Sequence, residues 1–252
     1  MTKIGIVGGV GWPATATYYR AICRAAADDY PGGSPPMVIE SLDMRTTMAS
    51  RGQSDDEASW RTFESIFAGA LETLQRVGCS VLAIASVTPH IRFAGITRSA
   101  EKPVISILDA TVQRATAAGV SDVLCLGTPL VLRAGLFDGA FESAGVRADR
   151  RFNPEQIDAF GAMLETYFYP GHARDGRASL LEFCRAKLAE TPGSPNPTII
   201  LGCTDLIDAF PEMEGETLFE VDGLQFLDPV ACHVRAVLDA FQDSHPDRTR
   251  GD

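Results

Sequence analysis

The stretch that most constrains the fold is residues 197–206, which reads Pro-Thr-Ile-Ile-Leu-Gly-Cys-Thr-Asp-Leu. A short apolar run rich in β-branched residues ends at Gly202 and is followed by Cys203. Such a run is typical of a buried strand in a parallel sheet. Open α/β sheets bind their ligands beyond the carboxyl ends of the strands. Cys203 is therefore placed where a reactive side chain is expected, although a free cysteine also packs well in a core.

A second stretch of the same kind covers residues 80–90, where an apolar run ends in Ser86 and is followed by Thr88. Each of the two stretches is preceded, at nearly the same distance along the chain, by another apolar run that ends in glycine. These glycines are Gly8 for Ser86 and Gly127 for Cys203. The pattern predicts an internal duplication, with Ser86 and Cys203 on opposite walls of one cleft.

The predicted fold class is therefore α/β with two pseudo-symmetric lobes. We expect each lobe to be a three-layer α/β/α sandwich around a parallel sheet, with the active site in the cleft between the lobes. A chain of 252 residues is long enough for two such units. We expect residues 1–107 and 225–252 to form the N-terminal lobe and residues 108–224 to form the C-terminal lobe.

The composition excludes several classes of function. The net charge is −11 and no basic tract is present, which argues against nucleic acid or an anionic membrane surface as a partner. No apolar run approaches the length of a membrane span. The six cysteines lack CxxC or Cys/His spacing, which predicts no metal site and a cytoplasmic protein with reduced thiols.

Residues 3–11 form an apolar run that continues into a glycine loop, but they do not match a dinucleotide fingerprint. Gly11 is followed by Trp12 and Pro13 rather than by the helix-packing glycine of that motif. We expect Gly9, Val10 and Gly11 to bring backbone amides close to a carboxylate at a helix N-terminus. A tight turn without a ligand is the alternative.

Periodicity and turn residues predict the remaining elements. We expect helices over residues 58–77, 108–118, 137–144, 154–167, 179–189 and 230–241, and strands over residues 37–42, 81–85, 103–107, 122–127, 147–152 and 218–221. Residues 43–56 are polar and are expected to be irregular. Arg45 and Arg51 lie in this segment and are candidates for binding a carboxylate, although exposed arginines are commoner.

Four motifs, taken together, resemble the aspartate/glutamate racemase superfamily over nearly the whole chain. They are Ile4–Gly11, Ser86–His90, Leu126–Thr128 and Leu201–Asp205. Trp12 resembles the broad-specificity amino-acid racemase branch, as does the run Tyr-Tyr-Arg at residues 18–20. The resemblance implies two pseudo-symmetric α/β lobes, chemistry without a cofactor or metal, two cysteines on opposite faces of the substrate, and a homodimer.

The sequence keeps only one of those two thiols. Cys203 matches the second cysteine of the family, whereas Ser86 stands at the position of the first. Val87 replaces an asparagine and Val131 replaces a threonine, and both changes remove donors to a carboxylate. The residues expected to bind the substrate are Gly9, Val10, Gly11, Arg51, Val87, Thr88, Thr128, Val131, Thr204 and Asp205.

The expected chemistry is the transfer of a proton at a carbon next to a carboxylate. The enediolate that develops needs several hydrogen-bond donors. We expect helix N-termini to lower the pKa of a thiol here below its unperturbed value of about 8.5, so that a thiolate forms readily. A serine hydroxyl is far less acidic, so Ser86 is a poor base and a better donor.

These features lead to one main hypothesis and two alternatives. The main hypothesis is a cofactor-independent amino-acid racemase or epimerase that acts on a small carboxylic or amino acid through Cys203 and Ser86. One alternative is a one-cysteine lyase or decarboxylase of the same superfamily, similar to dimethylsulfoniopropionate lyase or arylmalonate decarboxylase. The other is a non-catalytic protein that binds small acids.

Overall fold

The computed structural model describes residues 3–28, 30, 33–52, 56–148, 151–190 and 197–244. The chain divides into two compact units. Unit 1 comprises residues 1–107 and 233–252, and unit 2 comprises residues 108–232. Residues 225–232 thus belong to unit 2 rather than to the first lobe, where the sequence analysis placed them. The physical reason is that strand β8 (Leu224–Leu227) pairs with the second sheet.

Unit 1 contains one sheet and the helices that cover it. Its elements are β1 (Lys3–Gly8), α1 (Trp12–Ala25), β2 (Met37–Ser41), α2 (Met44–Ala49), the 3₁₀ helix η1 (Glu57–Trp60), α3 (Arg61–Arg76), β3 (Cys79–Ile84), the 3₁₀ helix η2 (Thr88–Arg92), α4 (Phe93–Thr97), β4 (Val104–Ile105) and most of α10 (Pro229–Asp243). Segment 43–56, expected to be irregular, contains helix α2, which Asp43 caps by accepting from the amides of Arg45 and Thr46.

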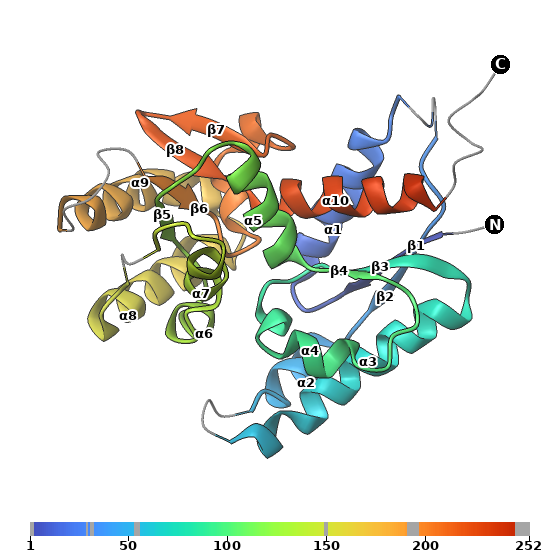
Figure 1. The fold of residues 1–252 in the computed structure, drawn as a ribbon. Helices are drawn as coiled ribbons and strands as arrows, with labels where there is room; N and C mark the ends of the chain where they lie inside the picture. The colour runs from blue at the N-terminus through green and yellow to red at the C-terminus, as the bar shows by residue number, and fades with distance from the viewer. Residues whose placement is uncertain are drawn as a thin grey trace. The chain divides into compact units, whose positions relative to one another are not determined.

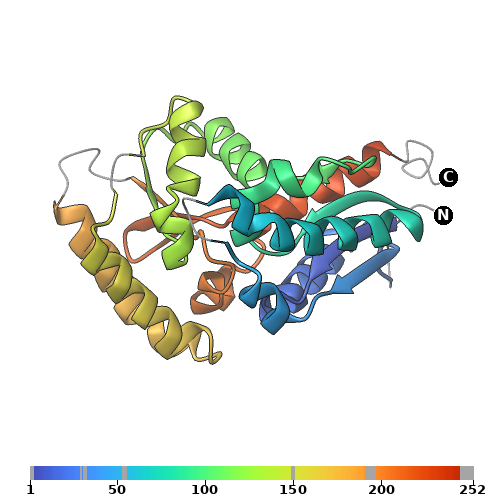
Figure 2. The same cartoon turned by 90° about the horizontal axis from the view of Figure 1, so that it is seen from below.

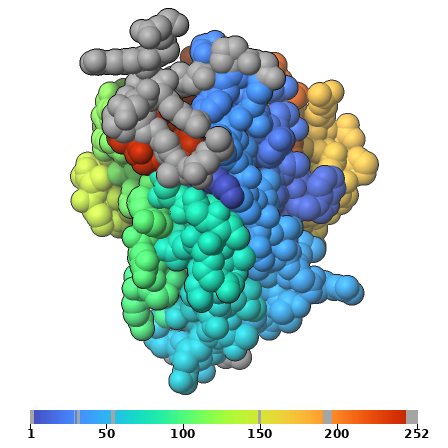
Figure 3. Space-filling view, turned by 90° about the vertical axis from the view of Figure 1, so that its right-hand side faces the viewer, coloured from blue at the N-terminus to red at the C-terminus, as the bar shows by residue number. Residues whose placement is uncertain are grey.

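The four strands of unit 1 are parallel and lie in the order β2-β1-β3-β4. Helix α3 packs on one face, against β1, β2 and β3, and buries Phe63, Phe67 and Leu71. Helices α1 and α10 lie on the other face (Figures 1 and 2). Figure 3 shows one face of this unit in a space-filling view, with α3 in teal and the end of α10 in red. The three layers place the carboxyl ends of β1, β2 and β3 along one edge.

Unit 2 contains the second sheet. Its elements are α5 (Ile107–Ala117), β5 (Val123–Cys125), α6 (Pro129–Arg133), α7 (Leu136–Ser143), α8 (Pro154–Met163), the π-helix η3 (Leu164–Phe168), α9 (Ala173–Glu190), β6 (Thr198–Ile200), the 3₁₀ helices η4 (Leu206–Ala209) and η5 (Pro211–Met213), β7 (Leu218–Val221) and β8. Helix α9 begins earlier than the sequence analysis expected.

Alternation along the strands of unit 2 separates two apolar layers. Leu124 and Leu201 face a cluster formed with Phe160 of α8 and Leu180 of α9. Cys125 points to the other face, where its thiol bonds to Asp138 of α7. The second sheet is therefore also covered by helices on both sides, as the predicted three-layer class requires.

The second sheet follows the same order of parallel strands as the first but carries an antiparallel strand at one edge. The second sheet runs β5-β6-β8-β7, with β5, β6 and β8 parallel and β7 antiparallel to β8. An isolated parallel bridge joins Asp122 to Arg147 on the far side of β5, where unit 1 has β2. Around residues 147–152, where a strand was expected, the described residues show only this bridge. Strand β7 thus adds one antiparallel edge to a sheet that is otherwise parallel, as predicted.

The antiparallel edge comes from a hairpin that the sequence analysis missed. Asp222 and Gly223, the two residues between β7 and β8, both have positive φ, at 51° and 75°. Two-residue hairpin turns of this type favour Asp-Gly because both central residues need positive φ. Across the described ranges, no helix is long and apolar enough to cross a membrane.

Candidate active site

In unit 1, the segments proposed to bind the substrate follow adjacent strands. Strands β1 and β3 are parallel neighbours, and β1 ends at Gly8 while β3 ends at Ile84. The loop of Gly9 to Gly11 and the residues from Ser86 to Thr88 therefore lie at the same edge of the sheet. Arg51 is half-buried and follows α2, beyond the neighbouring strand β2. This edge forms one candidate wall of the site.

The glycine loop has a backbone shape that only glycine adopts easily. Gly9 has φ of +80°, and a Cβ at this position would overlap the backbone of Leu42. The Gly9 amide donates to Oγ1 of Thr15 at 2.9 Å, so this structure uses it within the first turn of α1. Gly11 is the N-cap residue of α1, and its carbonyl accepts from the Thr15 amide at 3.2 Å.

Ser86 is half-buried and sits on a tight turn, separated from the end of β3 by Ala85. Its amide donates to the carbonyl of Ile84 at 2.8 Å, and its own carbonyl oxygen lies 3.0 Å from Nδ1 of His90. Val87 and Thr88 are buried. Burial, followed by the neighbouring His233, lowers the pKa of His90 to about 3. The imidazole is therefore neutral near pH 7 and holds the loop as a hydrogen-bonding group rather than as a charge.

In unit 2, the corresponding segments follow β5 and β6. A Cβ at Gly202 would overlap the carbonyl oxygen of Leu126, so only glycine lets these two loops approach so closely. Thr128 caps α6 by accepting from the amide of Val131 at 3.4 Å. The side chain of Val131 is buried and packs against Gly127. Thr128 and Val131 are thus brought beside the loop that carries Cys203.

Ser86 and Cys203 each lie in the loop that follows a parallel strand of their own unit, β3 for Ser86 and β6 for Cys203. The amide of Ala85 donates to the carbonyl of Val7 at 2.9 Å, whereas Gly202 lies against the carbonyl of Leu126. A bond from an amide to the carbonyl two residues earlier is made by Ser86 in unit 1 and by Gly202 in unit 2. The correspondence of Ser86 with Cys203 therefore stays a prediction.

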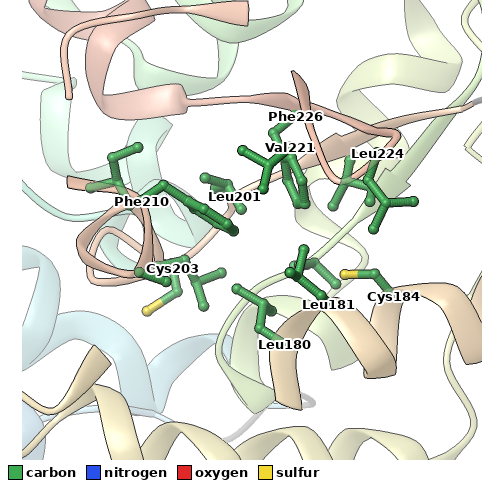
Figure 4. Close-up of a cluster of buried hydrophobic side chains, with 14 of the residues drawn as sticks. Leu180, Leu181, Cys184, Leu201, Cys203, Phe210, Val221, Leu224 and Phe226 are labelled. Atoms are coloured by element: carbon green, nitrogen blue, oxygen red, sulfur yellow. The ribbon is translucent and has the colours of Figure 1, made fainter. Parts of the chain in front are cut away.

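Cys203 is only 4% exposed and belongs to the apolar cluster of unit 2. Figure 4 shows it at one edge of that cluster, with its sulfur directed away from Leu224 and Phe226. Its Sγ lies 3.9 Å from Oδ2 of Asp205. The segment that follows is half-buried at Thr204 and then enters the short 3₁₀ helix η4.

The pKa of the Cys203 thiol is raised well above its ordinary value, chiefly by burial and next by the charge of Asp205. The sequence analysis expected the opposite direction. That expectation assumed the N-terminus of an α-helix, whereas the structure has a single 3₁₀ turn and a carboxylate beside the sulfur. In the unliganded protein, Cys203 is therefore a thiol at neutral pH.

Asp205 is the second titratable group in the loop that carries Cys203. Burial, followed by the charge of Asp208, raises its pKa to about 6. Its Oδ1 is buried and has no hydrogen-bond partner within the described part of the chain. At neutral pH the group is mostly ionised and can still accept a hydrogen bond from a donor, most strongly from a cation.

Asp205 was predicted to bind the substrate, but its effect on the thiol was not predicted. The two-residue spacing of Cys203 and Asp205 was the available signal. The bond between His90 and the backbone of Ser86 was also not predicted, and the four-residue spacing was a weak signal for it. Among the described residues, no group of three or more His, Cys, Asp or Glu side chains is arranged to hold a metal ion.

Comparison with solved structures supports the fold. The chain is similar to an aspartate racemase homologue from Pyrococcus horikoshii OT3, with a TM-score of 0.75, 23% identity, and coverage of 95% of this chain and 98% of the other. A proposed Asp/Glu racemase from Yersinia pestis gives a TM-score of 0.77, 21% identity, and coverage of 96% and 100%. The aspartate racemase of Picrophilus torridus gives 0.71, 15%, and coverage of 95% and 94%.

The sequence itself carries the family assignment. The model of the Asp/Glu/Hydantoin racemase family matches residues 7–237, which include both strand-end motifs, the glycine loop and the first turns of α10. The chain belongs to the Asp/Glu/hydantoin racemase family.

Proposed function

We propose that the protein is an amino-acid racemase or epimerase that transfers the α-proton of a small amino acid between Cys203 and Ser86. The observation that supports this proposal is that each residue lies in the loop after a parallel strand of its own sheet, Ser86 after β3, which pairs with β1, and Cys203 after β6, which pairs with β5. Racemisation needs one group to remove a proton from one face of the substrate and another group to return a proton to the opposite face. A thiol and a hydroxyl that come from two different loops suit this task.

Asp205 supports an amino acid as the substrate. Its buried Oδ1 can accept a hydrogen bond, and a substrate ammonium is a strong donor to such a carboxylate. An ammonium at this oxygen offsets the negative charge that raises the pKa of Cys203. Binding of the substrate thus favours the thiolate that removes the α-proton.

The two proton-transferring groups differ in strength. The Cys203 thiolate takes the α-hydrogen and becomes a thiol, leaving an enediolate on the substrate. The Ser86 hydroxyl donates its proton to the opposite face, and the resulting alkoxide takes a proton from water. The hydroxide that forms accepts the proton of the Cys203 thiol, which restores both groups. Because the two enantiomers have equal free energies, kcat/KM is the same in both directions, and the cost of forming the Ser86 alkoxide limits the rate from either side.

We infer that the enzyme works without a cofactor, in the cytoplasm, as a homodimer. All six cysteines are free, as expected in a reducing compartment. The homodimer is proposed from the family resemblance, and the exposed Trp12, Tyr19 and Met44 of unit 1 are candidates for its interface. Light scattering of the purified protein tests the dimer, since a single-chain mass would contradict it.

Solvent-deuterium exchange tests the proposed activity. The protein is incubated in deuterated buffer with each enantiomer of a panel of small amino and carboxylic acids, and deuterium incorporation is measured beside chirality. A racemase gives incorporation with inversion. Release of a cleaved or decarboxylated product would instead support the lyase or decarboxylase that Ser86 at the first position suggests. Binding without exchange would support a binding protein.

A further inference from the structure

Two histidines of unit 1 are buried and hydrogen-bonded to the backbone. His90 is 4% exposed and His233 is fully buried. Nε2 of His90 lies 3.2 Å from the amide nitrogen of Ile107, which can only donate, so this ring nitrogen carries no proton. In a neutral ring the proton is then on Nδ1, which donates to the carbonyl oxygen of Ser86 at 3.0 Å.

The tautomer of His233 is fixed in the opposite sense. Its Nε2 lies 2.9 Å from the carbonyl oxygen of Ile105, which can only accept, so Nε2 carries the proton. Its Nδ1 accepts from the Tyr18 hydroxyl at 2.7 Å. The edge of this ring meets His90 with the centroids 6.3 Å apart and the planes at 84°.

Packing and burial keep both rings neutral. The His90 ring stacks on Phe93 at 4.9 Å, with the planes within 8° of parallel. Burial is the main cause of the low pKa of both groups, about 3 for His90 and about 4 for His233. Each ring therefore keeps one tautomer across the neutral range, and each nitrogen keeps one hydrogen-bonding role.

The backbone partners of the two rings lie where the chain passes between its units. Strand β4 ends at Ile105, and unit 1 ends at Ile107, the first residue of α5. His233 is the residue at which the chain returns to unit 1 within α10. The His90 ring therefore joins the Ser86 loop to the outgoing segment, and His233 joins the same segment to the returning helix.

We propose that His90 is a positioning residue, whose single tautomer ties the carbonyl of Ser86 to the segment at Ile107 and so sets where the Ser86 hydroxyl is presented. This inference rests on the proposed function of Ser86 as a proton-transferring group. It assigns no proton transfer to His90 itself.

Two substitutions separate the two hydrogen bonds of the ring. In His90→Asn, Nδ2 of the asparagine is as far along the side chain as Nδ1 of the histidine and can still donate to the Ser86 carbonyl, but no atom replaces Nε2. In His90→Gln, Oε1 of the glutamine is as far along the side chain as Nε2 of the histidine and can still accept from the Ile107 amide, but the donor to Ser86 is lost. Both variants lose the ring, so they serve as controls for each other. His172→Gln, at an exposed histidine of unit 2, is the control for substitution of a histidine in general.

The catalytic readout is the ratio of inversion to deuterium exchange for the enantiomer whose α-hydrogen faces Cys203. Exchange at this face needs Cys203 alone, whereas inversion also needs a correctly placed Ser86. We expect His90→Gln to lower the ratio by about tenfold or more, because small misplacements of a reacting group cost that much. His90→Asn should keep a ratio close to that of the wild type. Equal losses in both variants, or no change in His90→Gln, would overturn the proposal.

A second readout needs no substrate. Nitrogen-15 NMR should show His90 protonated at Nδ1 and His233 protonated at Nε2. Amide hydrogen exchange at Ile107 should be faster in His90→Asn, which removes its acceptor, and unchanged in His90→Gln. The carbon-13 shift of the Ser86 carbonyl should change in His90→Gln, which removes its donor, and stay the same in His90→Asn. Protonation of His90 at Nε2, or the same changes in both variants, would overturn the positioning role. If the wild type exchanges no acid but these patterns hold, the proposed function fails while the positioning of the loop stands.

Discussion

Replacing Asp205 with asparagine should lower the pKa of the Cys203 thiol. The carboxylate oxygen lies 3.9 Å from the sulfur, and its charge is the second cause, after burial, of the raised thiol pKa. Two unit charges at this separation repel by about 4 kcal/mol at an effective dielectric constant of about 20, and by about 1 kcal/mol in water. Asp205 is partly exposed, so the true value lies between these limits.

Since each 1.36 kcal/mol is a factor of ten, removing this charge should lower the proton affinity of the thiol by a factor between about five and about a thousand. Asparagine has nearly the same shape as aspartate, so burial of the sulfur changes little. The pKa should therefore stay above its ordinary value while falling below that of the wild type.

The assay is a pH titration of the ultraviolet absorbance of the thiolate. Subtracting the titration curve of Asp205→Asn/Cys203→Ser from that of Asp205→Asn leaves the signal of Cys203 without the other five cysteines. Subtracting the curve of Cys203→Ser from that of the wild type gives the reference titration of Cys203. Asp158→Asn, at a carboxylate of the same unit that bonds Arg133, is the matched control. If the thiolate of Asp205→Asn appears at the same or a higher pH than in the wild type, the electrostatic account of the pair is wrong.

Three further predictions concern the walls of the site and the stability of the fold. Ser86→Cys should raise the rate of racemisation because it restores a thiol pair, and a fall in that rate would count against the two-base scheme. The wild type should turn over aspartate and glutamate weakly and prefer an acid with one less polar end; Val87→Asn/Val131→Thr should raise affinity for the dicarboxylates, since each buried donor to a charged acceptor contributes about 1.5–3 kcal/mol. Efficient wild-type turnover with no gain in the double variant would show that these valines do not line the pocket. Burial raises the pKa of Asp228 from 3.8 to about 7, so between these pH values the native state binds more protons than the unfolded state. The free energy of unfolding should therefore fall by about 4 kcal/mol as the pH rises through this range. Urea unfolding of Asp228→Asn should lack this loss, and a pH dependence equal to that of the wild type would contradict the prediction.

Much of the framework follows from patterns in the sequence. The apolar runs that precede Ser86 and Cys203 become β3 and β6, and the amphipathic run from residue 58 to residue 77 becomes η1 and α3. In both patterns, apolar residues recur with the period of the element whose face they bury, and this period can be seen directly in the local sequence. The hairpin of β7 and β8 was also encoded, by the pair Asp222 and Gly223, and a closer reading of turn residues would have found it.

The electrostatics of the site could not be predicted in the same way. The expectation of a lowered thiol pKa was reasonable for a cysteine before a helix, but the direction depends on how deeply the sulfur lies and where the Asp205 carboxylate turns. The tautomer of His90 likewise depends on Ile107, a residue far along the chain. Such quantities are set by tertiary contacts, which the spacing of residues does not contain.

The central claim is that Cys203 and Ser86 act on opposite faces of one amino-acid substrate. The most direct test measures deuterium incorporation from solvent into each enantiomer separately, by the wild type, Cys203→Ser and Ser86→Ala, with circular dichroism to verify that each variant is folded. We expect Cys203→Ser to lose incorporation by orders of magnitude for the enantiomer whose α-hydrogen faces the thiol, and Ser86→Ala to keep this incorporation but lose inversion. Near-normal turnover by Cys203→Ser, or equal losses for both enantiomers in both variants, would contradict it.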